Sequence, residues 1–403
     1  MDGSCKRVRL GQVLDAILNT PMECAGQILP GLPDHLAMEC LARVPLGSLT
    51  GVSKTWQNII YDPYFQSFRA SIGRSKLDWV YTLVQMQDKS FKWRAFDPLS
   101  SQWHDLPPTP HPMDFQLLNP GCIGVSYSVQ CVSTSSKLVM VAAVKAKKDG
   151  QPRMTVEPAL EHPYIFDTST NSWKQGSPFS VPRKWCVCGV ADEKVYVASG
   201  SGKDWSQELS KSAEFYNLEN DKWERLQKLS TSKFSGEAMN AVLNNNKLYF
   251  VSGRGVFSKD GVVYDLGTNS WLEMSPGLKW GWRGPCVSVN GKFYLLETPA
   301  GKLKVYVPER DEWDTIMLDS RLANLEVFVG TKGKIVAIEA ASGKDKETNA
   351  GSLLRVIDIA SETPQIFDIP VQDGQVVSVQ VLAMMNQVHE LLHLLEEYQH
   401  CGL

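Results

Sequence analysis

The chain has 403 residues, 43% of them hydrophobic, and its 41 lysines and arginines against 44 aspartates and glutamates give a formal charge of -3. This length accommodates one large domain and a small one. No apolar run reaches the ~18 residues of a membrane span, and the slightly acidic balance disfavours nucleic-acid binding. The nine cysteines, an odd number, indicate reduced thiols. Because the N-terminus also has no apolar signal core, we expect a cytoplasmic and/or nuclear protein without a membrane partner.

The N-terminal fifth has its own pattern. Residues 1–28 are expected to form a flexible extension, whereas apolar residues in 29–69 recur at helical spacing. Pro33 and Asp34 predict a helix start, and Pro45 separates this helix from the next apolar stretch. Two faces result, one with Leu36, Cys40, Leu41 and Val44 and another with Leu49, Val52, Trp56, Ile59 and Ile60. About forty helical residues can hardly bury a core alone, so this piece needs a partner.

The order of short motifs in this segment resembles an F-box. Leu32-Pro33-Asp34 comes first, then the Pro45 break, Ser53-Lys54-x-Trp56 and Asp62-Pro63-x-Phe65. The resemblance implies a small all-α domain that docks a Skp-type adaptor and so joins a cullin-RING ubiquitin ligase. The implied contact face is Leu32, Pro33, Leu36, Leu41, Val44, Pro45, Leu49, Val52 and Trp56. The alternative is a helical cap packed on the larger C-terminal domain.

One phrase recurs through most of the remaining chain. It reads FDPLSSQW at 96–103, FDTSTNSW at 166–173, YNLENDKW at 216–223, YDLGTNSW at 264–271 and YVPERDEW at 306–313. The tryptophans are 70, 50, 48 and 42 residues apart, and short apolar runs begin at Lys137, Lys194, Lys247, Lys292 and Lys334. Repetition at about 40–50 residues predicts the blades of a β-propeller.

In a four-strand blade lettered a to d, the lysine run is strand b and the phrase is strand c turning into d. The tryptophan is expected to fill the wedge between blades, and the preceding Asp or Asn to satisfy turn amides. Residues 353–370 predict strands c and d of a sixth blade, with Phe367 near the tryptophan's place. Blade one lacks a strand a, so we expect the run 376–385 to close the ring.

These blades resemble the kelch family, which carries paired glycines after strand b and a tryptophan on strand d. Ser199-Gly200 and Ser252-Gly253 each keep one glycine, and the resemblance covers about residues 76–386. Together the segments resemble the F-box/kelch-repeat proteins that are abundant in plants, including their Skp-interacting-partner group. The expected fold is mainly β, a six-bladed kelch-type β-propeller behind a small all-α F-box. The implied function is substrate recognition in an SCF-type E3 ubiquitin ligase, without enzymatic activity or cofactor.

A candidate surface for the target protein lies where the d–a and b–c loops emerge together. Arginine and tryptophan, which dominate protein-binding hot spots, are frequent there. The candidate residues are Arg183, Lys184, Trp185, Lys203, Trp205, Arg254, Lys279, Trp280, Trp282 and Arg283. Such a cluster would suit an acidic or phosphorylated segment, with the lysine-rich loops 145–162 and 341–351 extending it. The alternative is that these side chains pack between blades.

Two other interpretations concern chemistry. The HELLH sequence at 389–393 matches a zinc-protease pattern, but 387–403 is better interpreted as an amphipathic helical tail. A metal-dependent kelch enzyme would have only His104, His111 and His162 as histidine ligands in the propeller. We therefore predict no catalytic residue and no metal. A kelch-propeller enzyme and a non-degradative protein-binding scaffold remain as alternatives.

Overall fold

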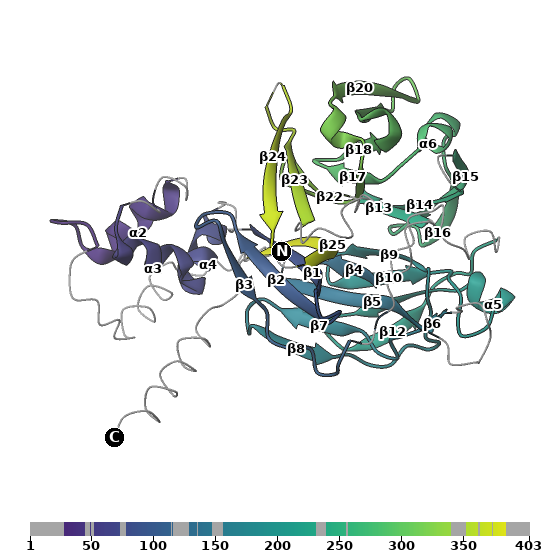
Figure 1. The fold of residues 1–403 in the computed structure, drawn as a ribbon, viewed down its shortest axis with the longest axis horizontal. Helices are drawn as coiled ribbons and strands as arrows, with labels where there is room; N and C mark the ends of the chain where they lie inside the picture. The colour runs from purple at the N-terminus through teal and green to yellow at the C-terminus, as the bar shows by residue number, and fades with distance from the viewer. Residues whose placement is uncertain are drawn as a thin grey trace, which may run out of the picture. The chain divides into compact units, whose positions relative to one another are not determined.

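A computed structural model provides the architecture (Figure 1). The structure describes residues 28–44, 49, 52–72, 78–113, 115, 129–134, 136–146, 156–230, 239–254, 257–339, 352–361, 363–372 and 374–383. The chain divides into two compact units, Met1–Lys76 and Leu77–Leu403. Pro45 and the HELLH sequence lie outside the described residues.

The N-terminal unit contains helices α2 (Asp34–Arg43), α3 (Lys54–Tyr61) and α4 (Pro63–Ser71). Helix α2 begins directly after Pro33, as predicted, and the Ser53 hydroxyl caps α3 by accepting from the Trp56 amide at 3.1 Å. The core consists of Ile28, Ala37, Leu41, Ala42, Leu49, Ile59, Ile60 and Phe65. Buried Arg69 of α4 donates to the carbonyls of Ala42 and Val44, 2.6 and 2.8 Å away, and so satisfies the C-terminus of α2.

The second unit consists of six antiparallel sheets, which confirms the mainly β, six-bladed propeller. Blade one contains β25 (Gly374–Ala383), β1 (Asp78–Met86), β2 (Phe91–Asp97) and β3 (Gln102–Asp105). Blade two contains β4 (Val129–Ser133), β5 (Lys137–Ala146), β7 (Tyr164–Asp167) and β8 (Ser172–Gln175), with β6 (Val156–Pro158) paired to β5. Blade three contains β9 (Val187–Ala191), β10 (Lys194–Ala198), β11 (Ala213–Asn217) and β12 (Lys222–Arg225).

Blade four contains β13 (Met239–Asn244), β14 (Lys247–Arg254), β15 (Phe257–Asp265) and β16 (Ser270–Glu273). Blade five contains β17 (Cys286–Val289), β18 (Lys292–Glu297), β19 (Lys302–Val307) and β20 (Glu312–Leu318). Blade six contains β21 (Leu325–Thr331), β22 (Lys334–Glu339), β23 (Ser352–Asp358) and β24 (Gln365–Val371). Short helices α5 (Gln207–Ser210), α6 (Pro276–Gly281), η2 (Thr298–Ala300) and η3 (Ser320–Leu322) lie in the loops. Each of the five lysines that open an apolar run begins a strand b.

The two ends of the propeller sequence meet in blade one. Strand β25 lies beside β1 (Figure 1) and pairs with it antiparallel over their lengths. The Tyr81 hydroxyl also donates to the Ala383 carbonyl at 2.8 Å. The innermost strands β25, β4, β9, β13, β17 and β21 each contact the next, and β21 returns to β25. The inner edges of the sheets are therefore covered all round, with the closing strand at Gly374–Ala383 where the sequence placed it at 376–385.

The repeated tryptophans join neighbouring blades through their indole N–H groups. Trp103 donates to the Pro370 carbonyl of blade six at 3.2 Å. Trp173, Trp223 and Trp271 donate to the carbonyls of Pro107, Ser177 and Gln227, at 2.9, 3.0 and 2.9 Å, and each acceptor follows strand d of the preceding blade. We call each of these bonds a tryptophan latch. The Asp or Asn of the phrase binds turn amides, as expected, for example Asp265 with Gly267 and Thr268.

Phe367 lies one residue beyond the position that is equivalent to the tryptophan. In blade four Tyr264, the residue before the phrase's Asp, pairs with Trp271, and the same pairing holds in the other tryptophan blades. In blade six Ile357 holds that position and pairs with Ile366, whereas Phe367 pairs with Val356 and is 50% exposed. The longer c–d turn of blade six shifts the register, and a shift of one residue moves a side chain to the opposite face.

The tryptophan latch should contribute measurably to propeller stability. Trp223→Phe keeps an aromatic ring but removes the donor to Ser177, so we expect the free energy of unfolding to fall by about 1–2 kcal/mol. Urea denaturation followed by circular dichroism measures this change. Trp205→Phe, at a side chain that is 63% exposed, is the control and should change stability by less than about 0.5 kcal/mol. Equal stability of Trp223→Phe and the wild type would show that the latch contributes nothing.

Candidate functional site

The predicted adaptor face separates into an exposed part and a buried part. Pro33 is exposed, and Leu36 and Val52 are 41% and 55% exposed. Leu32, Val44 and Trp56 are partly buried. Leu41 and Leu49, at 2% and 3% exposure, lie in the core of the helical unit and are not available to a partner. The prediction was wrong for these two, because helical spacing identifies an apolar face without saying whether the chain or a partner covers it.

Trp56 has a role within its own unit. Its indole N–H donates to the Ile28 carbonyl at 3.0 Å, and the Ile28 amide donates to the Asp34 carboxylate at 3.2 Å. The segment that precedes α2 is thereby tied to both α2 and α3. Trp56 can contact an adaptor only with the part of its ring that this hydrogen bond leaves exposed.

The candidate target surface includes two residues that are buried. Arg183 and Glu214 form an ion pair at 2.5 Å, with side chains only 1% and 5% exposed. Arg183 also donates to the Ser199 carbonyl and the Ser212 hydroxyl, both at 3.0 Å, so it fastens the d–a loop before blade three to its b–c loop. Trp282 is 2% exposed and packs in the core between blades four and five. For both residues the packing alternative is correct.

Lys184 and Trp185 also make contacts within the propeller. Lys184 is 6% exposed, and its Nζ donates to the Val156 carbonyl at 2.5 Å and lies 5.0 Å from the centre of the Trp185 ring. Trp185 is half-buried and has a φ of 53°, which a bulky residue rarely adopts. The residue before it, Lys184, forms a short antiparallel bridge with Ser201.

The exposed part of the candidate surface is carried by two different loops. Lys203 and Trp205 lie in the b–c loop of blade three, and Trp205 is 63% exposed. Trp280 of α6 is 60% exposed, and Lys279 Nζ lies 5.6 Å from its ring centre. Arg283 follows in the same loop and is exposed. The side chain of Arg254, and residues 147–155 and 340–351 of the two long loops, lie outside the described part of the chain.

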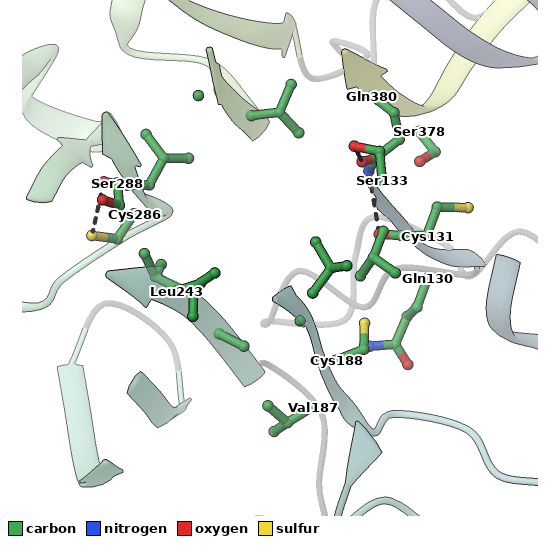
Figure 2. Close-up of a pocket in the computed structure, with 18 of the residues that line it drawn as sticks. Gln130, Cys131, Ser133, Val187, Cys188, Leu243, Cys286, Ser288, Ser378 and Gln380 are labelled. Atoms are coloured by element: carbon green, nitrogen blue, oxygen red, sulfur yellow. Dashed lines mark hydrogen bonds between the residues drawn. The ribbon is translucent and has the colours of Figure 1, made fainter. Parts of the chain in front are cut away.

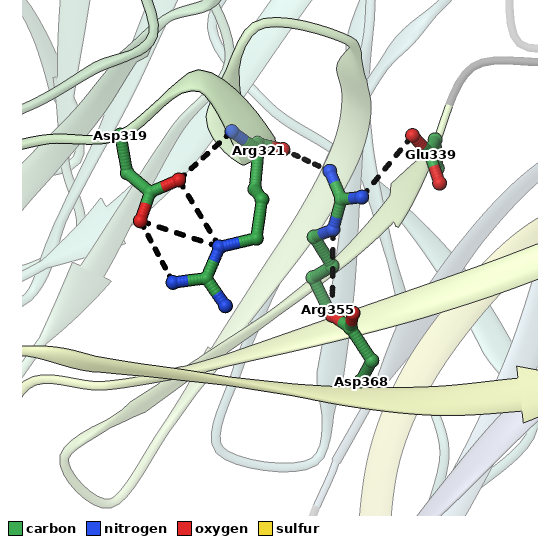
Figure 3. A network of polar contacts seen from close by, with 5 residues as sticks. All are labelled: Asp319, Arg321, Glu339, Arg355 and Asp368. Carbon is green, nitrogen blue, oxygen red and sulfur yellow. Dashed lines mark hydrogen bonds and ion pairs between the residues drawn. The ribbon is translucent and has the colours of Figure 1, made fainter.

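A charged network that the sequence analysis missed lies at this same end of blade six (Figure 3). Arg355 donates to the Arg321 carbonyl and to Glu339, the latter at 3.2 Å, and pairs with Asp368 at 3.4 Å. Arg321 pairs with Asp319 at 2.7 Å, and its hydrogen bonds lower the pKa of Asp319 to about 2. The sequence did contain one indication of this network, an arginine inside the apolar strand LLRVID. A charged side chain in a buried strand requires polar or charged partners.

The inner strands of all six blades surround a central cavity of about 290 Å³ (Figure 2). Its lining includes amide, hydroxyl and thiol side chains but no Asp, Glu, Lys, Arg or His among the described residues. The Gln130 amide bridges to the Cys186 backbone at 2.5 and 3.1 Å, and Gln380 accepts from the Ser133 hydroxyl at 2.9 Å. These polar groups connect neighbouring blades.

The cysteines of the cavity are poorly suited to catalysis. Burial raises the pKa of Cys131 to about 12 and that of Cys186 to about 11, and it also raises the pKa of Cys188 and Cys286. The thiols are therefore protonated at neutral pH, whereas nucleophiles and metal ligands require the thiolate.

The three histidines considered as metal ligands each contact a different residue. His104 stacks on Trp79, His111 lies 6.4 Å from the Tyr164 ring, and His162 bonds to the Gly176 carbonyl at 3.0 Å. Among the described residues there is no group of three or more metal-ligating side chains. No helix in the described part of the chain is long and apolar enough to cross a membrane.

Comparison with known proteins identifies the class of this molecule. The F-box/kelch-repeat protein SKIP25 of Arabidopsis thaliana is 31% identical over 373 residues, which cover 89% of this chain and 90% of the relative. Two further F-box/kelch-repeat proteins of Arabidopsis thaliana are 26% and 28% identical, covering 74% and 72% of this chain and 73% of each relative. No family model matches the chain. The combination of a propeller with an N-terminal helical unit is that of a kelch protein with an F-box. The chain belongs to the F-box/kelch-repeat family.

The buried ion pair between Arg183 and Glu214 should be essential for the stability of the propeller. Glu214→Gln leaves the Arg183 charge without a counter-ion in the interior, so we expect the free energy of unfolding to fall by about 3 kcal/mol. Glu208→Gln removes the partner of Lys228 from a pair with side chains 82% and 64% exposed, and should leave the stability nearly unchanged because exposed pairs are screened by solvent. Urea denaturation of both variants measures the difference, and equal stability of the two variants would contradict the assignment.

Proposed function

We propose that this protein is the substrate-recognition subunit of an SCF-type E3 ubiquitin ligase. In this proposal α2, α3 and their connection dock a Skp-type adaptor, and the adaptor links the chain to a cullin-RING ligase. The d–a and b–c end of the propeller binds the target protein. Catalysis is then proximity supplied to a separate ubiquitin-loaded enzyme, which requires no reactive group on this chain. A cytoplasmic or nuclear location belongs to the same proposal.

The adaptor proposal rests on which apolar side chains of the helical unit are exposed and which are buried. Its core is already filled by Leu41, Leu49, Ile59, Ile60 and Phe65. Leu36 and Val52 nevertheless remain 41% and 55% exposed, and Pro33 is exposed as well. Burying these apolar side chains against a partner is favourable at about 25 cal/mol per Å². Because they do not support the core, they can be changed without unfolding the unit.

Adaptor binding is tested with a variant that changes only exposed positions. Leu36→Asp combined with Val52→Asp puts charges into the proposed interface, so the co-expressed complex with a Skp-type adaptor should be lost on size-exclusion chromatography. Tyr64→Asp, at a 42% exposed residue of α4 outside the predicted face, is the matched control and should retain the complex. A stable complex in the double variant would contradict the proposed face. Absence of any complex in the wild type would contradict adaptor docking itself.

Target binding is tested on an array of acidic and phosphorylated peptides. Trp205→Ala and Trp280→Ala should each weaken the bound peptides by about tenfold or more, as expected for a hot-spot tryptophan. Lys222→Ala, an exposed change at the opposite end of blade three, is the control and should leave binding unchanged. Peptide binding that neither tryptophan affects would move the target site elsewhere. In vitro ubiquitination of a bound target then distinguishes a degradative receptor from a non-degradative scaffold.

A further inference from the structure

The d–a loop between blades four and five departs from the repeat. The indole N–H of Trp313, the tryptophan of blade five, is buried and has no hydrogen-bond acceptor among the described residues. Helix α6 occupies the loop that supplies the acceptor in the other latches. The Asp311 carboxylate holds α6 by accepting from the Ser275 hydroxyl and from the amides of Gly277 and Leu278, at 2.9, 2.7 and 3.0 Å.

Two glycines of α6 allow this close approach. A Cβ at Gly277 would lie 1.6 Å from the Asp311 carbonyl oxygen, and one at Gly281 would lie 2.1 Å from Trp313 Cδ1. No side chain fits at either position. The helix is therefore fixed against blade five, and so is the start of the segment that follows it.

That segment runs over the end of strand β18, where Glu297 lies. Arg283 is exposed, and a Cβ at the next residue, Gly284, would lie 2.1 Å from the Leu296 carbonyl oxygen. The Pro285 carbonyl in turn accepts from the Leu296 amide at 3.0 Å. The backbone that carries Arg283 is thereby held against the end of β18.

Two lysines of strand β19 lie on the same face as Glu297. Lys302 is the cross-strand partner of Glu297, and Lys304, two residues further along β19, pairs with Glu297 at 2.8 Å. The side chains of Lys304 and Glu297 are each 20% exposed. The hydrogen bond from Lys304, together with the positive charges of Lys304, Lys302 and Arg283, lowers the pKa of Glu297. Three cations therefore lie around one carboxylate, and we call these four residues the basic cluster.

The charge of the basic cluster favours one class of anion. Glu297 offsets one of the three positive charges, which leaves an excess of two. A phosphorylated side chain carries a charge of about -1.5 to -2 at neutral pH and matches this excess, whereas a carboxylate carries a single charge. The chain as a whole has a formal charge of -3, which does not favour an extended polyanion.

We propose that the basic cluster binds the phosphate group of a phosphorylated serine or threonine in the target protein. This inference rests on the proposed function, because the cluster lies at the d–a and b–c end of the propeller. Arg283 and Lys302 contact the phosphate oxygens, and Glu297 positions Lys304 beside them. Trp280 precedes Arg283 in the same loop and is 60% exposed, so residues that flank the phosphate can pack on it.

The test measures the fluorescence polarisation of labelled peptide pools in the presence of the full chain. In each pool a fixed central residue, either phosphoserine or serine, is flanked by randomised residues. We expect the phosphoserine pool to bind about tenfold or more tightly than the serine pool, and added salt to weaken its binding. Arg283→Gln and Lys302→Gln should each weaken the phosphoserine pool by about tenfold and leave the serine pool unchanged. Lys222→Gln, the same charge change at the opposite end of blade three, is the matched control and should bind like the wild type.

A third variant should change binding in the opposite direction. Glu297→Gln removes the one negative charge of the basic cluster, so the phosphoserine pool should bind several-fold more tightly than it binds the wild type. Weaker binding would contradict the charge balance on which the inference rests. Unchanged thermal unfolding verifies that each variant is folded.

Three results would overturn the inference. The first is equal binding, or no binding, of the phosphoserine and serine pools; if Trp280→Ala still weakens both pools, the proposed target surface stands without a phosphate site. The second is an equal loss of binding in Lys222→Gln, which would show that overall charge attracts the peptide. The third is displacement by inorganic phosphate at the concentration of the peptide itself, which would make the free ion the ligand. Retention of the adaptor complex is measured separately, so failure of the phosphate site is distinguishable from failure of the proposed function.

Discussion

The tryptophan latch is the interaction on which the propeller depends. Each latch requires strand d of one blade to reach a carbonyl at or just after the end of strand d of the preceding blade. Trp103 does the same across the closure, with Pro370 near the end of β24 as its acceptor. The requirement fixes the turn between strands c and d and the path out of strand d. It does not involve the loop between strands b and c. That loop is therefore free to vary in length, as the spacing of the repeats shows.

Buried arginines hold loops in place at the end of the propeller where the d–a and b–c loops emerge. Arg183 fastens the b–c loop of blade three through Glu214, and Arg355 connects η3 with strands b and d of blade six (Figure 3). Such pairs gain little net free energy over apolar packing, but breaking one leaves an uncompensated charge inside the protein. They hold loops of blades three and six in place at this end of the propeller. Arg183 and Arg355 thus have a structural role at this end.

Sequence alone predicted the parts of the fold that repeat. The register of the Asp and Trp residues and the lysines at strand b were enough to place six blades and the closing strand, because identical packing demands identical spacing. It could not predict which candidate residues are exposed. Arg183 and Trp282 have the residue types of a hot spot but are buried, and Leu41 has the spacing of a docking face but fills the core. Arg69, Glu214 and Arg355 were missed because each acts through partners distant in the sequence.

The junction between blades four and five shows why a departure from the repeat is informative. An unpaired buried N–H group costs about 1–3 kcal/mol, and Trp313 bears that cost although four equivalent tryptophans avoid it. Asp311 offsets part of the cost by binding α6 with its carboxylate, but a plain latch would have needed neither the helix nor its two glycines. Natural sequences break a local rule mainly where another requirement applies. At this junction α6, which Asp311 holds and the two glycines admit, takes the place of the latch.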